Sequence, residues 1–150
     1  MAKLNIVKLG DETLRKVSRP VDKITPRILT LLDDMAETMR AANGVGLAAP
    51  QVGVLRRIVV IEVEEGQLIE LINPKIVAYA GEQVGQEGCL SVPGRWGINR
   101  RPMHVTVQAQ NRHGETVEIS GSELLARAFC HELEHLDGKL FIDSMIEEVK

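Results

Sequence analysis

Apolar residues recur at steps of three and four in two segments of the chain, and this spacing predicts two amphipathic helices. The first helix is expected to begin at Thr25, whose hydroxyl can cap it, with Pro26 in its first position, and to end at Asn43-Gly44. The second is expected to start at Ser122 and to end at Gly138. The apolar stripes are Ile28, Leu31, Leu32, Met35 and Met39 in the first helix, and Leu124, Leu125, Ala128 and Phe129 in the second.

The residues between the two helices have the pattern of strands. Segment 57–63 is rich in valine and isoleucine, 68–72 is a second short apolar run, and apolar and polar residues alternate in 104–109. Segment 111–114 is a turn, after which 115–119 can return as the partner of a hairpin. The order of helix, strands and helix predicts an α+β fold with mostly antiparallel sheets.

Length and composition fit a single domain covering residues 1–150, which is large enough to bury a core without disulfides. The formal net charge of -3 argues against direct readout of nucleic acid, because phosphate binding favours a basic surface. We find no signal-peptide pattern at the start and no apolar run long enough to span a membrane. We therefore expect a cytoplasmic protein, in which Cys89 and Cys130 bind metal or are buried rather than forming a disulfide.

An HExxH sequence, residues 131–135, lies in the second predicted helix. Because His131 and His135 share one helical face, both imidazoles can reach one metal ion, and Glu132 lies beside that face. The ordinary alternative is a pair of unliganded histidines on an amphipathic helix. The two histidines continue the apolar face of Leu124 and Ala128, however, and buried imidazoles need partners. We therefore expect a metal site on a central helix around which the antiparallel sheets pack.

A catalytic metal site usually has three protein ligands, and the two helical histidines supply only two of them. One class of HExxH proteases supplies a third histidine after a glycine; Gly138 matches that glycine, but the next position required is Phe141. Another class uses a glutamate from a later helix, for which only Glu147 and Glu148 remain. The best candidate is Cys89, whose thiolate would complete a Cys-His-His set with one open position. The alternative for Cys89 is a small buried apolar side chain.

Segment 44–51, Gly-Val-Gly-Leu-Ala-Ala-Pro-Gln, is the third notable feature. Its two glycines and paired alanines allow the backbone to approach a ligand or a packed neighbour closely. By itself the segment is more simply a loop that ends the first helix. Gln51 adds a side-chain amide that can donate to an oxyanion.

These three segments, GVGLAAPQ at 44–51, EGCLSVP at 87–93 and HELEHLDG at 131–138, resemble the three motifs of the peptide deformylase family, in the same order. The resemblance extends from DETLRKVSRPV near the start of the chain to KLFID near its end. It implies a metal-dependent hydrolase that removes the formyl group from the N-terminal formyl-methionine of newly synthesised polypeptides and releases formate.

The resemblance also assigns roles to single residues. It implies that a water on the metal is activated by the catalytic glutamate and that the oxyanion is held by the metal, a glutamine side chain and a backbone N–H. The matching positions are Cys89, His131 and His135 for the metal, Glu132 for catalysis, Gln51 and the Leu90 N–H for the oxyanion, and Val45, Gly46 and Leu124 for the methionine pocket and peptide cleft. Glu87 and Arg101 match a charged pair that steadies the cysteine loop.

Two positions differ from the commonest family pattern. Cys130 replaces a glutamine before the first histidine, and we expect it to pack in the core. Glu134 replaces an aspartate, so a hydrogen bond from this acid to a histidine would need a different geometry. His104 and His113 match nothing in the family and are expected on a surface strand and a turn.

The resemblance implies one divalent metal ion, iron(II) in the cell, with zinc, nickel or cobalt able to replace it in purified protein. The implied partners are N-formylmethionyl nascent peptides, with transient contact to the ribosome left open. Two other functions also remain open at this point. One is an HExxH peptidase that cuts internal peptide bonds, and the other is a non-catalytic metal-binding or ribosome-associated module.

Overall fold

The computed structural model describes residues 2–150 and contains two α-helices among them. The helices are α1 (Pro26–Ala41) and α2 (Leu124–Leu136), with short 3-10 helices η1 (Glu12–Arg15), η2 (Ala49–Val52) and η3 (Phe141–Asp143). The strands are β1 (Gly46–Ala48), β2 (Ile58–Ile61), β3 (Ile69–Ala80), β4 (Gln83–Cys89), β5 (Val92–Arg101), β6 (His104–Gln110), β7 (Thr116–Ser122) and β8 (Glu147–Val149).

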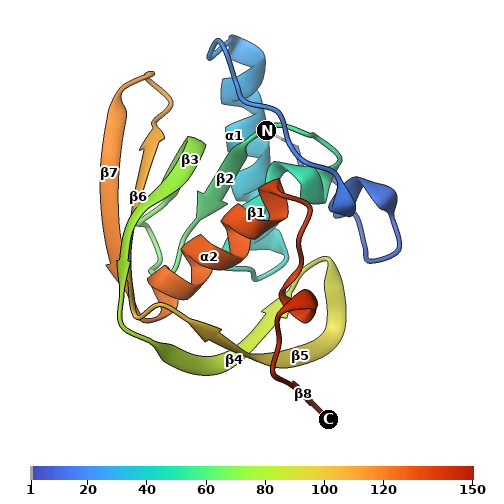
Figure 1. Cartoon of the computed structure of the whole chain (residues 1–150). Coiled ribbons are helices and arrows are strands. Elements are labelled where there is room, and N and C mark those ends of the chain that lie inside the picture. The colour runs from blue at the N-terminus through green and yellow to red at the C-terminus, as the bar shows by residue number, and fades with distance from the viewer. Residues whose placement is uncertain (1) are drawn as a thin grey trace.

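The strands form two sheets, and every pairing between these strands is antiparallel. The larger sheet has the order β1-β2-β3-β6-β7, and the smaller has the order β4-β5-β8. In Figure 1 the strands curve around α2, with β7, β6 and β3 on one side of it and β4 and β5 below. The expected α+β fold with antiparallel sheets is confirmed, and residues 131–135 lie in α2.

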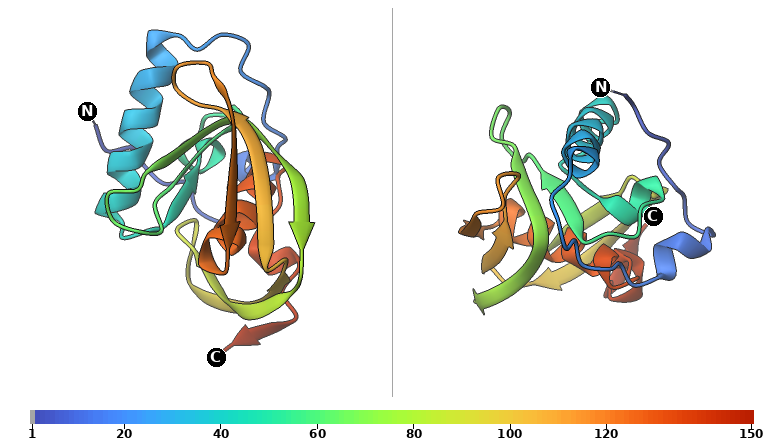
Figure 2. Two further views of the ribbon diagram at one scale, coloured as in Figure 1. Left: turned by 90° about the vertical axis from the view of Figure 1, so that its left-hand side faces the viewer. Right: turned by 90° about the horizontal axis from the view of Figure 1, so that it is seen from above.

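At its β1-β2 end the larger sheet is covered on both faces, by α2 on one face and by α1 on the other (Figure 2). Along β2, Val59 and Ile61 point into a cluster with α2, whereas Ile58 and Val60 point into a cluster with α1. This arrangement explains why the run of valine and isoleucine in 57–63 does not alternate with polar residues: a strand buried on both faces has no solvent side.

The first helix begins as predicted. The Thr25 hydroxyl accepts a hydrogen bond from the Ile28 N–H, and Pro26 occupies the first turn. The second helix begins later than predicted, because Ser122 is the last residue of β7 and Glu123 turns the chain with a φ of 57°. No helix among residues 2–150 is long and apolar enough to cross a membrane.

Three features of the sheets were not predicted. β4, β5 and β8 lie in segments without an alternating pattern. β3 continues through Asn73-Pro74, where its register against β6 shifts and the Asn73 side chain hydrogen-bonds the backbone of Val21 instead. Segment 44–51 was expected as a loop, but most of it forms β1 and η2.

Candidate metal centre and its cleft

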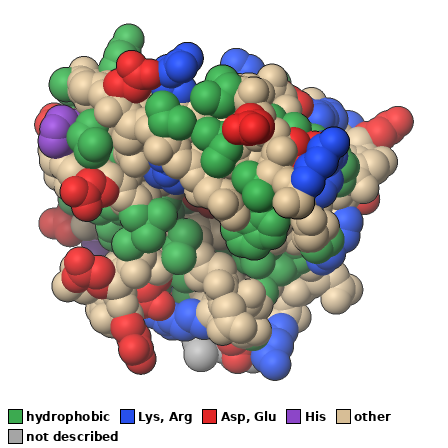
Figure 3. Space-filling model, turned by 90° about the horizontal axis from the view of Figure 1, so that it is seen from below, with side chains coloured by type: hydrophobic (Ala, Val, Ile, Leu, Met, Phe, Trp, Pro, Cys, Tyr) green, Lys and Arg blue, Asp and Glu red, His purple; other side chains and the backbone are tan. Residues whose placement is uncertain are grey.

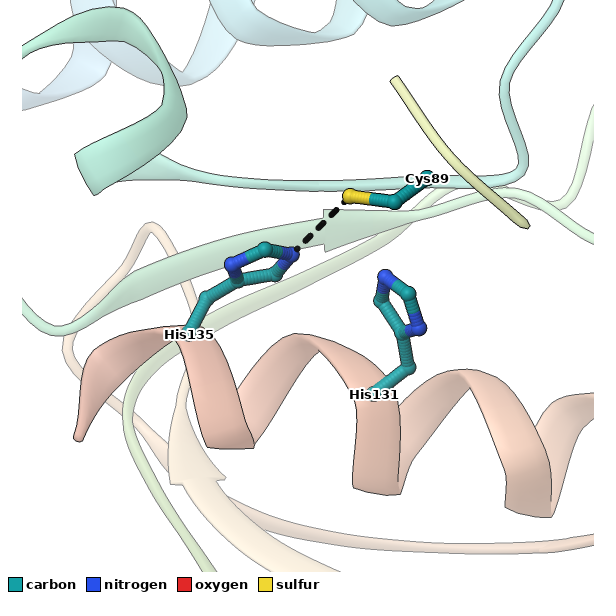
Figure 4. A group of neighbouring side chains, drawn as sticks. All are labelled: Cys89, His131 and His135. Atoms are coloured by element: carbon teal, nitrogen blue, oxygen red, sulfur yellow. Dashed lines mark hydrogen bonds between the residues drawn. The ribbon is translucent and has the colours of Figure 1, made fainter. Parts of the chain in front are cut away.

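Three side chains with metal-binding atoms meet between α2 and the end of β4. Cys89 is the last residue of β4, and His131 and His135 lie one turn apart on α2 (Figure 4). Their ligand atoms all lie within 4.8 Å of one another, and Cys89 Sγ is 3.4 Å from His135 Nε2. A thiolate and two imidazoles at this spacing could hold one divalent ion.

The surroundings of the three residues fit a metal ion. Both histidines are buried, His131 with 8% and His135 with 1% of its surface exposed. Burial and the neighbouring His131 lower the pKa of His135 well below its usual value, so its imidazole is neutral, the form that binds metal. Two buried imidazoles and a half-buried thiol that face one another without a carboxylate between them are stabilised when an ion satisfies them together.

Glu87 orients the first histidine. One of its carboxylate oxygens lies 3.1 Å from His131 Nδ1, which leaves His131 Nε2 for the centre. Arg101 donates two hydrogen bonds to Glu87, at 2.8 and 3.0 Å. Although burial alone would raise it, these bonds from Arg101 and His131 lower the pKa of Glu87 to about 2, so the carboxylate is ionised at neutral pH. The pairing of Glu87 with Arg101 follows the expectation from the sequence.

Arg127 is a member of this network that the sequence analysis missed. It is 7% exposed, and its Nη1 lies 2.9 Å from Glu87 Oε2. It also donates to the Gln83 side chain, so it connects α2 to β4. A signal was available, because Arg127 lies four residues before His131 and therefore on the face of the helix that carries the ligands.

Glu134 pairs with the network from its outer side. Its carboxylate is 2.9 Å from Arg101 Nη1. Glu134 therefore contacts Arg101 rather than a histidine, and the carboxylate that orients His131 is that of Glu87. Cys130, the other departure from the family pattern, is 8% exposed and packs in the apolar cluster between α2 and the larger sheet, as expected. His104 and His113 are exposed, on β6 and in the turn before β7.

We expect Glu87→Gln to lower the free energy of unfolding by about 3–5 kcal/mol, because the buried Arg127 loses its anionic partner and the buried Arg101 keeps only Glu134. Equilibrium denaturation of the metal-free protein measures this loss. Glu82→Gln is the matched control, since it removes the partner of the exposed Arg100 and should cost at most about 1 kcal/mol. Equal losses in the two variants would contradict a special role for the buried carboxylate.

Glu132 lies against the glycine of β1. A Cβ added to Gly46 would come within 2.5 Å of Glu132 Oε2, so only glycine lets β1 approach this carboxylate. Glu132 is 4% exposed, and its Oε1 is buried with no hydrogen-bond partner in the described part of the chain. Burial raises the pKa of Glu132 to about 7, against the opposing effect of His131, and a carboxyl group with this pKa can both accept and release a proton near neutral pH.

Gln51 lies on the other side of Cys89. Its Oε1 accepts a hydrogen bond from the Ala48 N–H, and this bond fixes the orientation of the amide. Its Nε2 lies 3.1 Å from Ser91 Oγ and 3.6 Å from Cys89 Sγ. Ser91, fully buried, is a further residue that the sequence analysis missed. Leu90 follows Cys89 in the turn between β4 and β5 and packs over Gly44.

A cleft of about 510 Å³ opens beside the centre. Its walls include Cys89, His131 and Glu132 together with Gln51 and Leu90. Three large apolar side chains on its walls are unusually exposed: Val45 at 41%, Leu124 at 47% and Trp96 at 49%. In the view from below, hydrophobic side chains gather around a hollow in the middle of the face, and charged side chains lie toward its outline (Figure 3).

The structure brings the residues singled out from the sequence into one place. Eight of them line the cleft, namely Val45, Gly46, Gln51, Cys89, Leu90, Leu124, His131 and Glu132, and His135 contacts Cys89 directly behind it. A peptide chain could lie in this cleft with its first side chain among apolar groups and its end beside the metal-binding atoms.

Known proteins are similar to this chain in sequence and fold. A family model described as polypeptide deformylase matches residues 3–150. A peptide deformylase of Acetivibrio thermocellus is 65% identical over 137 residues, which are 91% of this chain and 80% of that protein. The crystal structure of a peptide deformylase from Legionella pneumophila is similar with a TM-score of 0.93 at 45% identity, over 95% of this chain and 86% of that one.

A peptide deformylase from Synechococcus elongatus, solved in complex with actinonin, has a TM-score of 0.92 at 40% identity, covering 95% of this chain and 78% of that one. The residues that the family model matches, 3–150, include all three motifs and the strands of both sheets. The chain therefore belongs to the polypeptide deformylase family.

Proposed function

We propose that this chain carries out the family's reaction, the hydrolytic removal of the formyl group from nascent peptides, at the centre formed by Cys89, His131 and His135. The reaction and the hydrolase class follow from membership of the family. The roles given to single residues are the proposal. The observation that carries it is the meeting of three metal-binding atoms within 4.8 Å on the wall of an apolar cleft, next to a buried glutamate.

In this proposal Cys89, His131 and His135 hold one divalent ion. When bound, the ion supplies a Lewis acid for a water molecule and for the formyl carbonyl. Glu87 keeps His131 turned toward the centre through its Nδ1. The Glu132 carboxylate, whose Oε2 lies 4.0 Å from His131 Nε2, receives the proton of the attacking water. Glu132 then donates this proton to the leaving amine.

The negative charge that develops on the formyl oxygen needs hydrogen-bond donors. The Gln51 amide carries two N–H groups, of which one bonds Ser91 and the other can face the centre. The backbone N–H of Leu90 is the second donor in our proposal. Because the Ala48 N–H fixes Gln51, the amide is oriented before the substrate arrives.

The methionine side chain of the substrate is placed among apolar groups of the cleft. Val45 and Gly46 come from the loop and strand after α1, and Leu124 comes from the first turn of α2. Val45 and Leu124 are exposed in the cleft, so a bound methionine would remove their apolar surface from water.

We propose that residues 1–150 act as one catalytic domain in the cytoplasm, where formylated polypeptides are made. The substrates are N-formylmethionyl nascent peptides, and a transient contact with the ribosome would bring the enzyme to them. Direct readout of nucleic acid is not part of the proposal, since the net charge is -3.

The proposal is tested with metal-free protein that is reloaded without oxygen and assayed for formate release from formyl-Met-Ala-Ser. We expect iron(II), the ion proposed for the cell, to give active protein that is lost quickly in air. Cys89 would lie as a thiolate beside a redox-active ion, where oxidation of its sulfur by oxygen removes a ligand. Nickel(II) and cobalt(II) should give similar but more durable activity, and zinc(II) stable but slower turnover.

Two outcomes would count against the proposal, and they differ. Equal activity and equal durability in air with all four ions would contradict the argument about the Cys89 thiolate. Absence of formate with every ion, from protein whose metal content is shown to be complete, would contradict the proposed function itself.

A further inference from the structure

We propose that the ion pair between Arg95 and Glu148 determines how the enzyme discriminates charge in the peptide beyond the formyl-methionine. This inference rests on the proposed function, because it concerns the same cleft. It assigns a specificity role to two residues that the centre itself does not use.

Arg95 is the charged residue on the cleft wall that solvent reaches. The other acidic and basic side chains there, Glu87, Arg127, His131 and Glu132, are each less than 10% exposed and belong to the buried network or the centre. The Arg95 side chain is 38% exposed. A charged side chain of a bound peptide would therefore meet Arg95 before any other charged group of the cleft.

Glu148 neutralises this arginine. Its two carboxylate oxygens accept hydrogen bonds from Arg95 Nε and Nη2, both at 2.9 Å, in a bidentate pair. Glu148 belongs to β8, where it lies opposite Gly97 of β5. The last strand thus places an anion beside the cationic residue of the rim, and the Glu148 side chain is itself 33% exposed.

The rim that carries Arg95 is fixed to the centre. The neighbouring Trp96 packs its ring on Gly88, where an added Cβ would lie 2.5 Å from the ring, and Gly88 directly precedes Cys89. With the formyl group at the centre and the methionine in its pocket, the rest of the substrate leaves through the open side of the cleft. Two segments that line the cleft, 93–96 and 42–45, are available to contact this part of the peptide.

The consequence is a cleft border with balanced charge. With Glu148 in place, acidic and basic peptide side chains each meet one attractive and one repulsive group. Without the Glu148 carboxylate, Arg95 would attract acidic side chains and repel basic ones. Exposed ion pairs change free energies only modestly, so we expect selectivity changes of about 2- to 5-fold rather than an all-or-none effect.

The test compares amide-capped peptides of the form formyl-Met-Xaa-Ala-Ala and formyl-Met-Ala-Xaa-Ala, in which Xaa is Asp, Asn or Lys. For each protein, kcat/KM and the equilibrium Kd are expressed relative to the Asn peptide. In Glu148→Gln the relative kcat/KM and the relative affinity should rise for the Asp peptide and fall for the Lys peptide. Each change should be about 2- to 5-fold and should occur at one of the two positions. Arg95→Gln should shift the ratios in the opposite direction, and salt at about 0.5 M should reduce both shifts.

Glu82→Gln is the matched control, since it neutralises the exposed partner of Arg100 on the same strand, away from the cleft. It should leave the Asp-to-Lys ratio at the native value. If Glu148→Gln changes all peptides by the same factor, the pair only anchors β8 to β5 and the inference is wrong. If the native protein binds the peptides but releases no formate, the proposed function fails, and the Kd ratios still decide the inference.

Discussion

Replacing Glu132 with glutamine should lower the turnover of formyl-Met peptides by at least about 10²-fold. The amide has the shape of the carboxylate but cannot accept the proton of the attacking water or return it to the leaving amine. The fold and the metal should be retained, because Glu132 makes no hydrogen bond to the ligand residues and lies 4.0 Å from His131 Nε2. Formate release and metal content, measured on the same sample, check the prediction.

Glu134→Gln provides the matched control, since this acid lies on the same helix and pairs with Arg101 outside the cleft. It should keep most of the native turnover. If Glu132→Gln turned over formyl peptides at the native rate with a full metal site, Glu132 would not be the proton carrier. A loss of metal in that variant would instead show that the carboxylate supports the ion.

The centre could be predicted from the sequence because most of its geometry is local. Residues four apart on a helix face the same way in any fold, so His131 and His135 needed no tertiary information. Cys89 is different, because its approach to the helix depends on the turn between β4 and β5. Chemistry indicated only that a third ligand was missing, and the resemblance of the whole segment 87–93 supported this cysteine.

The smaller sheet escaped prediction for a physical reason. β4 and β5 contain Gly85, Gly88 and Gly97, where the backbone is pressed against side chains from elsewhere in the chain, namely Arg127, Trp96 and Met145. Glycine weakens the local preference for a strand, so these strands are stabilised by tertiary contacts rather than by an alternating pattern. The burial of Arg127 was missed for a related reason. An arginine is buried only where it has a partner, and its partner Glu87 is distant in the sequence.

Replacing Cys89 with alanine should largely abolish metal binding and with it the release of formate. Loss of a partner that only orients a ligand typically weakens metal binding by roughly 10- to 100-fold, so loss of the ligand itself should exceed that range. The remaining pair, His131 and His135, offers two neutral donors and no anion to offset the charge of a divalent ion. Metal per protein after extensive dialysis, measured by elemental analysis, reports the effect without relying on activity.

The chain offers a control for this substitution in its other cysteine. Cys130 adjoins His131 in sequence but packs in the apolar cluster, and burial raises the pKa of its thiol to about 11, so it is protonated and a poor ligand at neutral pH. Cys130→Ala should therefore keep the metal and most of the activity. If Cys89→Ala retained a full complement of metal, the third ligand would lie elsewhere and the Cys-His-His centre would be wrong. If both variants lost metal equally, the loss would reflect damage to α2 and its packing, and binding by the Cys89 thiolate would no longer be the explanation.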